Sequence, residues 1–136
     1  MCISDSMTSD AISDMLARIR NALKAGLPSV ELPGSRIKGE ILRVMKEEGY
    51  ITDFTMTDGV PRLLSIELKY NDDAEPAIRG MRRESRPGLR KFCGVQEIPN
   101  VLGGLGIAVL STSGGILSGK DARKRKLGGE LICTIW

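Results

Sequence analysis

The stretch that most constrains the fold is residues 105–117, LGIAVLSTSGGIL, an apolar segment that ends in hydroxyls and glycines. Residues 107–110 are apolar at positions that would face both sides of a strand, so we expect a central strand covered on both faces. The residues that follow are Ser111, Thr112, Ser113, Gly114 and Gly115. This end fits either the turn of a β-hairpin or a recognition surface, since hydroxyls hydrogen-bond without charge and glycines allow close backbone approach.

Histidine is absent from the 136 residues, and the three cysteines are Cys2, Cys93 and Cys133. The chain therefore lacks the commonest metal ligand and the usual general base near neutral pH. An odd number of cysteines without a C-x-x-C pair argues against a disulfide framework and a zinc site. The hydrophobic content of 41% is ordinary for a soluble protein of one or two small domains. We expect no metal and no cofactor.

We also expect no membrane segment and no targeting signal. No apolar run approaches the roughly 20 residues that a membrane span needs. Residues 1–6 lack the basic residue and the apolar core of a signal peptide, and Met7 is an alternative start. We therefore expect a cytoplasmic protein in a reducing compartment.

Charge is divided unevenly along the chain. Residues 1–78 hold 9 basic residues against 13 acidic ones, whereas residues 79–136 hold 11 against 4. Arginine dominates at the start of the second part, at Arg79, Arg82, Arg83, Arg86 and Arg90. Its planar guanidinium suits phosphate oxygens and guanine edges and stacks on bases. The second part is expected to face a polyanion such as nucleic acid, with a solvated strand face as the alternative for the arginines.

Residues 7–75 carry the pattern of a small domain with the element order α-β-α-β-β. Ser9 and Asp10 are good N-cap residues for the first helix, and Ser35 is one for the second, which Gly49 ends. The apolar stripe of the second helix consists of Ile37, Ile41, Val44 and Met45. The expected strands are 29–33, 50–56 and 64–70, the last two joined by a hairpin at Asp58-Gly59.

An acidic stretch at 71–75, followed by Pro76, is the expected boundary to a second, β-rich domain. Its expected elements are a strand at 78–90 interrupted by Pro87-Gly88, a strand at 89–95, a short helix at 97–102, the central strand, a partner strand that starts at 116–117, a basic helical turn at 119–126 and a strand at 130–136. The fold class is therefore α+β, with small domains at 7–75 and 76–136.

An enzyme is one alternative for the serines of the central strand. Ser111 or Ser113 would be the nucleophile, and the amides of Gly114 and Gly115 would form an oxyanion hole. No histidine can serve as the base, the spacing G-x-S-x-G is absent, and no lysine stands at an identifiable Ser-Lys spacing. No phosphate-loop motif is present either. We expect no catalytic activity and no small-molecule substrate.

RNA binding accounts for more of these features together. RNA helices hide base edges in a deep groove and expose 2′-hydroxyls and irregular loops, which short neutral side chains beside glycines can contact. The flanking arginines and lysines would add salt-dependent phosphate contacts. Glu130 is the one acidic residue close to this set. It either accepts hydrogen bonds from the Ser-Thr-Ser hydroxyls or backbone, or is a solvated strand end.

Five motifs, in the same order along the chain, resemble those of a known protein family. They are DMLARIRN at 14–21, KEEGYI at 46–51, SRPGLR at 85–90, GLGIAVLSTS at 104–113 and GGE at 128–130. From Met7 to Trp136 the chain resembles the bacterial form of the eighth protein of the small ribosomal subunit. The resemblance implies a ribosome-associated α+β protein of two domains that binds small-subunit ribosomal RNA and helps to fold its central domain.

The resemblance also implies partners and contact residues. Neighbouring small-subunit ribosomal proteins are expected partners, and the alternative function is repression of translation through an operon messenger RNA that imitates the ribosomal site. The residues implied to contact or support RNA are Ser111, Thr112, Ser113, Arg86, Pro87, Gly88, Arg90, Glu130, Arg18, Asn21, Ser35 and Lys38. Gly114 and Gly115 join this expected site because glycines allow close backbone approach.

Two positions depart from the family pattern. Gly114 stands where a basic residue is usual, so one phosphate contact is expected to be missing or moved to Lys120. Phe92 stands where tyrosine is common, which leaves base stacking or core packing as its expected role.

Overall fold

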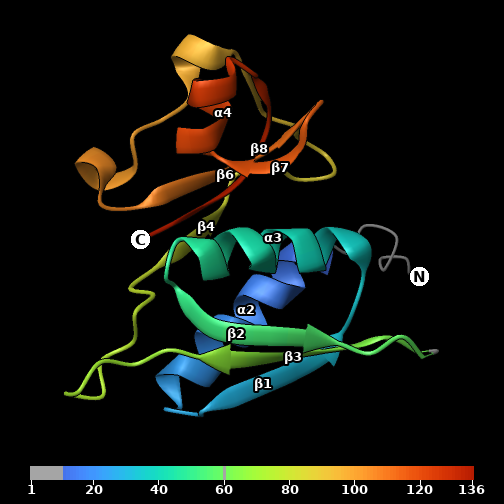
Figure 1. Ribbon diagram of the computed structural model, residues 1–136, viewed down its shortest axis with the longest axis vertical. Coiled ribbons are helices and arrows are strands. Elements are labelled where there is room, and N and C mark those ends of the chain that lie inside the picture. Colours follow the sequence, from blue (N-terminus) through green and yellow to red (C-terminus); the bar gives the residue numbers. More distant parts are fainter. Residues whose placement is uncertain (1–10, 60) are drawn as a thin grey trace. The chain divides into compact units, whose positions relative to one another are not determined.

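The computed structural model describes residues 11–59 and 61–136, which form two compact units (Figure 1). The N-terminal unit is residues 15–79, and the C-terminal unit is residues 80–136 together with residues 11–14. This division falls a few residues beyond the expected boundary at 75, which stays a prediction. The proposed start at Met7 and the expected caps Ser9 and Asp10 lie outside the described residues.

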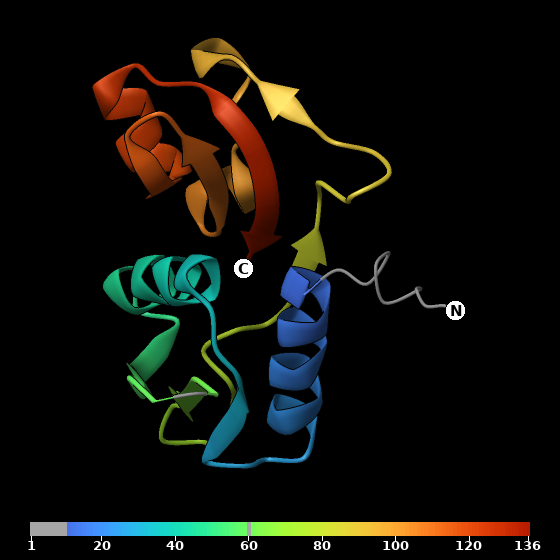
Figure 2. The same cartoon turned by 90° about the vertical axis from the view of Figure 1, so that its right-hand side faces the viewer.

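The helices and strands of the N-terminal part confirm the expected order α-β-α-β-β. They are α2 (Ala11–Lys24), β1 (Ser29–Pro33), α3 (Arg36–Glu47), β2 (Ile51–Met56) and β3 (Leu63–Leu68). The three strands are antiparallel in the order β1-β3-β2. Figure 2 shows α2 and α3 on the same side of this sheet, so one sheet face is covered and the other is open.

Helix α3 is the element whose ends the sequence specifies best. Ser35 is its N-cap, and its hydroxyl accepts a hydrogen bond from the Lys38 amide at 3.3 Å. Gly49, just past the C-cap, has a φ of 83°, which glycine adopts without a Cβ penalty. The expected stripe is wrong in one member, because Ile37 is 41% exposed in the first turn whereas Leu42 is fully buried.

Alternation along β3 shows how this sheet separates its two faces. Leu64, Ile66 and Leu68 are buried, whereas Ser65 and Glu67 lie on the open face. Strands β2 and β3 form the expected hairpin, although residues 57–62 make its connection longer than a two-residue turn. β3 ends at Leu68, before the expected end at residue 70.

Five strands and one helix make up most of the C-terminal unit. They are β4 (Met81–Arg83), β5 (Phe92–Cys93), β6 (Ile107–Thr112), β7 (Gly115–Ser118), α4 (Gly119–Arg125) and β8 (Gly129–Ile135). The sheet has the order β4-β8-β6-β7, with β5 also paired to β8. β6 therefore lies between two strands, and residues 108–110 are almost completely buried, which confirms the expected central strand.

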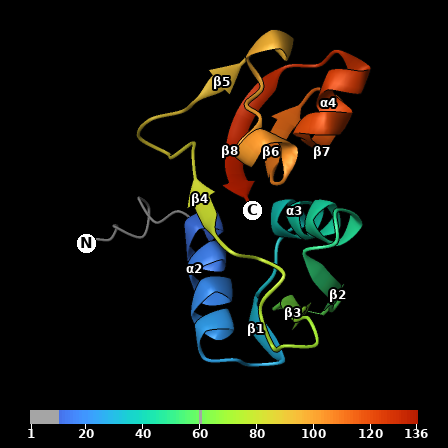
Figure 3. The same cartoon turned by 90° about the vertical axis from the view of Figure 1, so that its left-hand side faces the viewer.

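Helix α4 covers one face of this sheet (Figure 3). Its Ala122 packs in a cluster with Ala108, Leu110 and Leu117 from β6 and β7 and with Ile98 from the preceding loop. Ser118 caps the helix by accepting a hydrogen bond from the Asp121 amide at 3.2 Å. The expected basic helical turn is thereby confirmed.

The connection before β6 differs most from expectation. The arginine-rich strand expected at 78–90 is only Met81–Arg83, and the strand expected at 89–95 is only Phe92–Cys93. β4 and β5 pair with opposite ends of the same edge of β8, and residues 84–91 leave the sheet between them. The expected helix at 97–102 is instead two 3-10 turns, Val95–Glu97 and Val101–Gly104.

A bulge in β8 explains why the chain leaves the sheet. In the pairing of β6 with β8, Val109 lies opposite Cys133 and Leu110 lies opposite Leu131, so Ile132 is the extra residue of the bulge. The carbonyl of Ile132 accepts hydrogen bonds from the amides of Glu84 and Ser85 and from Nη1 of Arg83. Residues 84–91 are called the arginine loop below.

Candidate nucleic-acid interface

The Ser-Thr-Ser sequence closes a β-hairpin, and its role as a recognition surface stays a prediction. Thr112 ends β6 and lies opposite Gly115 at the start of β7, with Ser113 and Gly114 forming the turn. Gly115 has a φ of 105°, a conformation that side chains strongly disfavour. Ser113, Gly114 and Gly115 are all exposed, which makes this hairpin tip accessible to a partner.

The three hydroxyls of the hairpin tip have different surroundings. Thr112 Oγ1 donates to the carbonyl of Gly115 at 2.8 Å and accepts from the amide of Gly114 at 3.1 Å, so it stabilises the turn. Within residues 11–59 and 61–136, the side-chain hydroxyls of Ser111 and Ser113 have no hydrogen-bond partner. These two hydroxyls retain their hydrogen-bonding capacity for a ligand.

A row of side chains crosses the sheet next to the hairpin tip. Ser111 lies opposite Ile116 on one side and Glu130 on the other, and Glu130 lies opposite Phe92. Directly opposed residues in antiparallel strands project from the same sheet face. Phe92 is 72% exposed. The row therefore places an exposed aromatic ring two strands from Ser111, about 10 Å away at ordinary strand spacing.

The carboxylate of Glu130 binds the arginine loop instead of the serines. Its Oε2 accepts a hydrogen bond from the Ser85 hydroxyl at 2.5 Å and lies 3.1 Å from Nη1 of Arg90. The expected bond to the Ser-Thr-Ser hydroxyls is thus wrong, since the Glu130 side chain reaches across toward β5 rather than β6. The side chain is 19% exposed, so it is not a solvated strand end either.

Backbone hydrogen bonds hold the tip of the arginine loop. Arg86 and Leu89 exchange two hydrogen bonds of 3.0 and 2.9 Å around Pro87-Gly88. Arg86 is exposed, and no hydrogen bond or ion pair of its guanidinium is found among the described residues. Arg86 and Arg90 therefore differ, because Arg90 already pairs with a carboxylate.

The expected contact residues of the N-terminal unit lie on its two helices and at their ends. Arg18 and Asn21 are exposed and lie three positions apart on α2, which places them on one helix face. Ser35 caps α3. Lys38 is only 6% exposed, and its ammonium donates to the carbonyl of Pro33 at 2.9 Å, so we leave it out of the proposed interface.

Ser85 is a structural member of this site that sequence reasoning did not single out. It is completely buried, and its hydroxyl both donates to Glu130 and accepts from the amide of Lys91 at 3.1 Å. The sequence signal available for Ser85 was a small polar residue between the charged residues Glu84 and Arg86. Its partner, 45 positions later in the sequence, becomes evident only through strand pairing.

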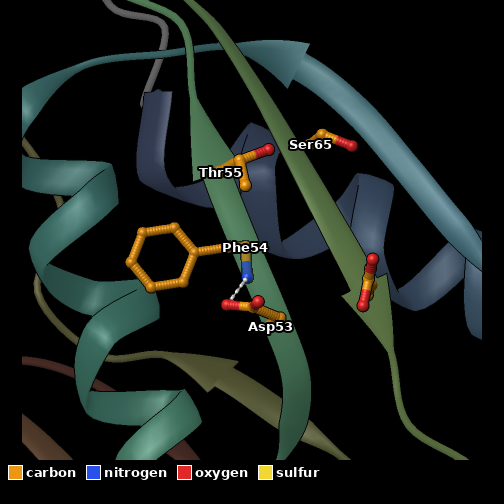
Figure 4. A pocket seen from close by; sticks show the side chains of 5 residues that line it. Asp53, Phe54, Thr55 and Ser65 are labelled. Atoms are coloured by element: carbon orange, nitrogen blue, oxygen red, sulfur yellow. Dashed lines mark hydrogen bonds between the residues drawn. The ribbon is translucent and has the colours of Figure 1, made fainter.

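A depression on the open face of the N-terminal sheet is lined by Asp53, Phe54, Thr55, Ser65 and Glu67 (Figure 4). Its volume of about 30 Å³ is far below the roughly 300–1,000 Å³ of small-molecule sites. A hydrogen bond from Lys46, and then one from the Phe54 amide, lower the pKa of Asp53. This depression is therefore too small to hold a small-molecule substrate.

The cysteines and acidic residues do not suggest other chemistry. Cys93 and Cys133 are free thiols. Burial and then the charge of Glu97 raise the pKa of Cys93, which keeps this thiol protonated at neutral pH. In the part of the chain that the structure describes, no three histidine, cysteine or acidic side chains are grouped to hold a metal ion. No helix there is long and apolar enough to cross a membrane.

Comparisons with known proteins show the family to which this chain belongs. The family model described as Ribosomal protein S8 matches residues 10–136. A protein of Solibacter usitatus (strain Ellin6076) named small ribosomal subunit protein uS8 is 49% identical over 131 residues, which cover 96% of this chain and 100% of that protein. A protein of the same name from Anaeromyxobacter sp. (strain K) is 52% identical, and the match covers 93% of this chain and 97% of that protein. Another, from Persephonella marina (strain DSM 14350 / EX-H1), is 50% identical, and the match covers 96% of this chain and 100% of that protein. The chain therefore belongs to the ribosomal protein S8 family.

Proposed function

We propose that this chain binds small-subunit ribosomal RNA directly through its hairpin tip and arginine loop, and so helps to fold the central domain of that RNA. The observation that carries the proposal is a difference in hydrogen bonding among the three hydroxyls of the hairpin tip. Thr112 holds the turn, whereas Ser111 and Ser113 have no hydrogen-bond partner among the described residues. Two such hydroxyls beside two exposed glycines are suited to recognition of a ligand.

Family membership fixes the class of function. As a member of the ribosomal protein S8 family, the chain is a structural constituent of the ribosome and not an enzyme. The residues agree, because the chain has no histidine that could activate Ser111 or Ser113 as a nucleophile. A serine-reactive probe is expected to label neither residue, and labelling of either would contradict this assignment.

RNA suits the hairpin tip better than a protein partner does. Hydroxyls without charge can donate to base acceptors and accept from 2′-hydroxyls, and both groups are exposed in irregular RNA helices. Phe92 adds a flat apolar surface on the same sheet face, and base stacking on such a ring is worth about 1–3 kcal/mol. Its 72% exposure argues against the alternative role in core packing.

The arginine loop supplies two different contributions to this interface. The exposed guanidinium of Arg86 is available for a phosphate, which would make its contribution dependent on salt. Arg90 pairs with Glu130, so we assign it mainly to shaping the loop. Pro87 and Gly88 form the exposed turn between them and allow an RNA backbone to approach closely.

The N-terminal unit is assigned secondary contacts with RNA. Arg18 and Asn21 present one face of α2, and Ser35 lies at the start of α3. Neighbouring small-subunit ribosomal proteins are proposed partners of the chain. Repression through its own operon messenger RNA would use the same hairpin tip, and a messenger fragment that competes with the ribosomal helix for this protein would support it.

Footprinting of small-subunit ribosomal RNA with the full chain tests the proposal directly. Hydroxyl-radical cleavage is expected to fall at one irregular helix of the central domain when the protein is added. A competing unrelated duplex at equal mass should leave the protection intact, since specific affinities exceed non-specific ones by orders of magnitude. Absence of protection, or protection that the unrelated duplex abolishes, would overturn the proposal.

A further inference from the structure

Arg125, the last residue of α4, lies against the hairpin tip although it is 11 positions away in the sequence. A Cβ atom placed on Gly114 would be 3.6 Å from Nη1 of Arg125 and 3.0 Å from Cδ1 of Leu127. The guanidinium and the leucine therefore occupy the space into which a side chain at position 114 would project. The missing side chain at Gly114 thus leaves room for the side chain of Arg125.

Arg125, like Arg86 and unlike Arg83, Arg90 and Arg123, has a guanidinium with no bond to the described residues. Nη1 of Arg83 donates to the carbonyl of Ile132, Arg90 pairs with Glu130, and Arg123 donates to the carbonyls of Ile98 and Pro99. Within the described ranges 11–59 and 61–136, the Arg125 guanidinium has neither an ion pair nor a hydrogen bond. Its side chain is exposed, so its donors are available to an anion.

We propose that Arg125 is the phosphate-binding residue of the hairpin tip and takes the place of a cationic side chain at position 114. Its guanidinium can donate two parallel hydrogen bonds to a phosphate of the strand whose ribose or base contacts Ser111 and Ser113. The absence of a side chain at Gly114 leaves the room that this guanidinium needs. This inference rests on the proposed function, because it names the ionic contact of the same site.

The structure favours Arg125 over Lys120 for this role. Lys120 is the second residue of α4 and Arg125 the last, so the two are separated by about 7.5 Å along the helix axis. Of these two residues, Arg125 is the one found next to the position of a Gly114 Cβ atom. The phosphate contact expected to move to Lys120 is therefore assigned to the other end of the helix.

Salt-dependent binding to the ribosomal helix identified by footprinting tests the inference. Arg125→Ala is compared with Lys124→Ala, which removes the same charge from an exposed neighbour on the same helix end. Arg125→Ala is expected to weaken binding about tenfold at 0.1 M salt and to lower the slope of log K against log[salt] by about 0.7–0.9. Lys124→Ala is expected to change affinity less than threefold, that is, by about 0.6 kcal/mol or less.

A rescue experiment separates a phosphate contact from a structural role. In the Arg125→Ala background, Gly114→Lys should restore the salt slope and most of the affinity, since it returns a cation to the same space. Gly114 is not in the left-handed region of φ, and only the end of the flexible Leu127 side chain must move. Arg125→Lys should keep the slope with a smaller loss of affinity, because an ammonium lacks the planar fork.

The outcomes distinguish this inference from the function on which it rests. If the wild-type chain fails to bind the ribosomal helix selectively, both are overturned. If it binds selectively and Arg125→Ala weakens binding no more than Lys124→Ala, the inference alone is overturned. A tenfold loss at Arg125 that Gly114→Lys does not reverse also overturns it, because the loss then reflects a structural effect. Circular dichroism melting of each variant confirms that the protein compared is folded.

Discussion

The hydroxyl of Ser85 donates a hydrogen bond to Oε2 of Glu130 at 2.5 Å and so joins the arginine loop to β8. Glu130 lies opposite Ser111 in β6 and opposite Phe92 in β5. One carboxylate therefore sits between the serine and the exposed ring and fixes the base of the loop. Arg90 neutralises this carboxylate, which lowers its repulsion of an approaching phosphate.

Removal of the Ser85 hydroxyl should destabilise the fold. Ser85→Ala leaves the Lys91 amide and a largely buried carboxylate with one partner fewer, so we expect a loss of about 1–3 kcal/mol in the free energy of unfolding. Urea denaturation measures this loss. Ser113→Ala, at an exposed site, is the control and should stay within about 0.5 kcal/mol of wild type. Equal stability of the two variants would contradict the role of Ser85.

Thr112 should matter for the hairpin itself. Thr112→Val keeps the shape of the side chain but removes the bonds to Gly115 and Gly114, and we expect a loss of about 1 kcal/mol. Thr112→Ser keeps the hydroxyl and should lose less. Thermal unfolding of both variants provides the comparison, and a serine variant as unstable as the valine variant would argue against these bonds.

Gly129 should not tolerate a side chain. Its Cβ would lie 2.1 Å from the carbonyl oxygen of Ser111 in the neighbouring strand, so Gly129→Ala must push β6 and β8 apart. We expect a loss of about 1–3 kcal/mol in urea denaturation. Gly88→Ala meets nothing within 4 Å and should be neutral or stabilising by about 0.4–1 kcal/mol. A Gly129→Ala variant with wild-type stability would show that these strands are not so closely paired.

Asp53 should make stability depend on pH in the acid range. Its hydrogen bond with Lys46 lowers its pKa below the ordinary value of 3.8, so the folded state binds this proton less readily than the unfolded state does. The stabilisation is present above pH 3.8 and is lost as the pH falls through the lower folded-state pKa. Asp53→Asn should be less stable than wild type at pH 7 and approach it at lower pH. A difference that is constant with pH would contradict this.

Local sequence patterns were sufficient for the elements that depend on local rules. The apolar residues 107–110 indicated a central strand, and Ser35 and Gly49 marked the ends of α3. Small polar residues and glycines indicated a hairpin at 111–115 as one of two alternatives. In each case the sequence neighbours themselves determine the structure, through burial on both faces, side-chain capping or φ above zero.

The features that were missed depend on residues far apart in the sequence. The arginine loop leaves the sheet because a bulge at Ile132 supplies its hydrogen-bond acceptor, which no pattern within 84–91 reveals. The direction of the Glu130 side chain depends on Ser85, and the space beside Gly114 depends on Arg125. Such contacts follow from strand pairing and helix placement, so residue type and spacing alone do not predict them.

The central claim is that the hydroxyls of Ser111 and Ser113 choose the RNA, whereas charge supplies general affinity. The most direct test compares Ser111→Ala and Ser113→Ala with Thr55→Ala, which removes an exposed hydroxyl from the N-terminal sheet. Binding is measured to the ribosomal helix and to an unrelated duplex RNA at several salt concentrations. We expect the two serine variants to lose about 1–3 kcal/mol on the ribosomal helix only, with an unchanged salt slope. Equal losses on both RNAs would contradict the claim.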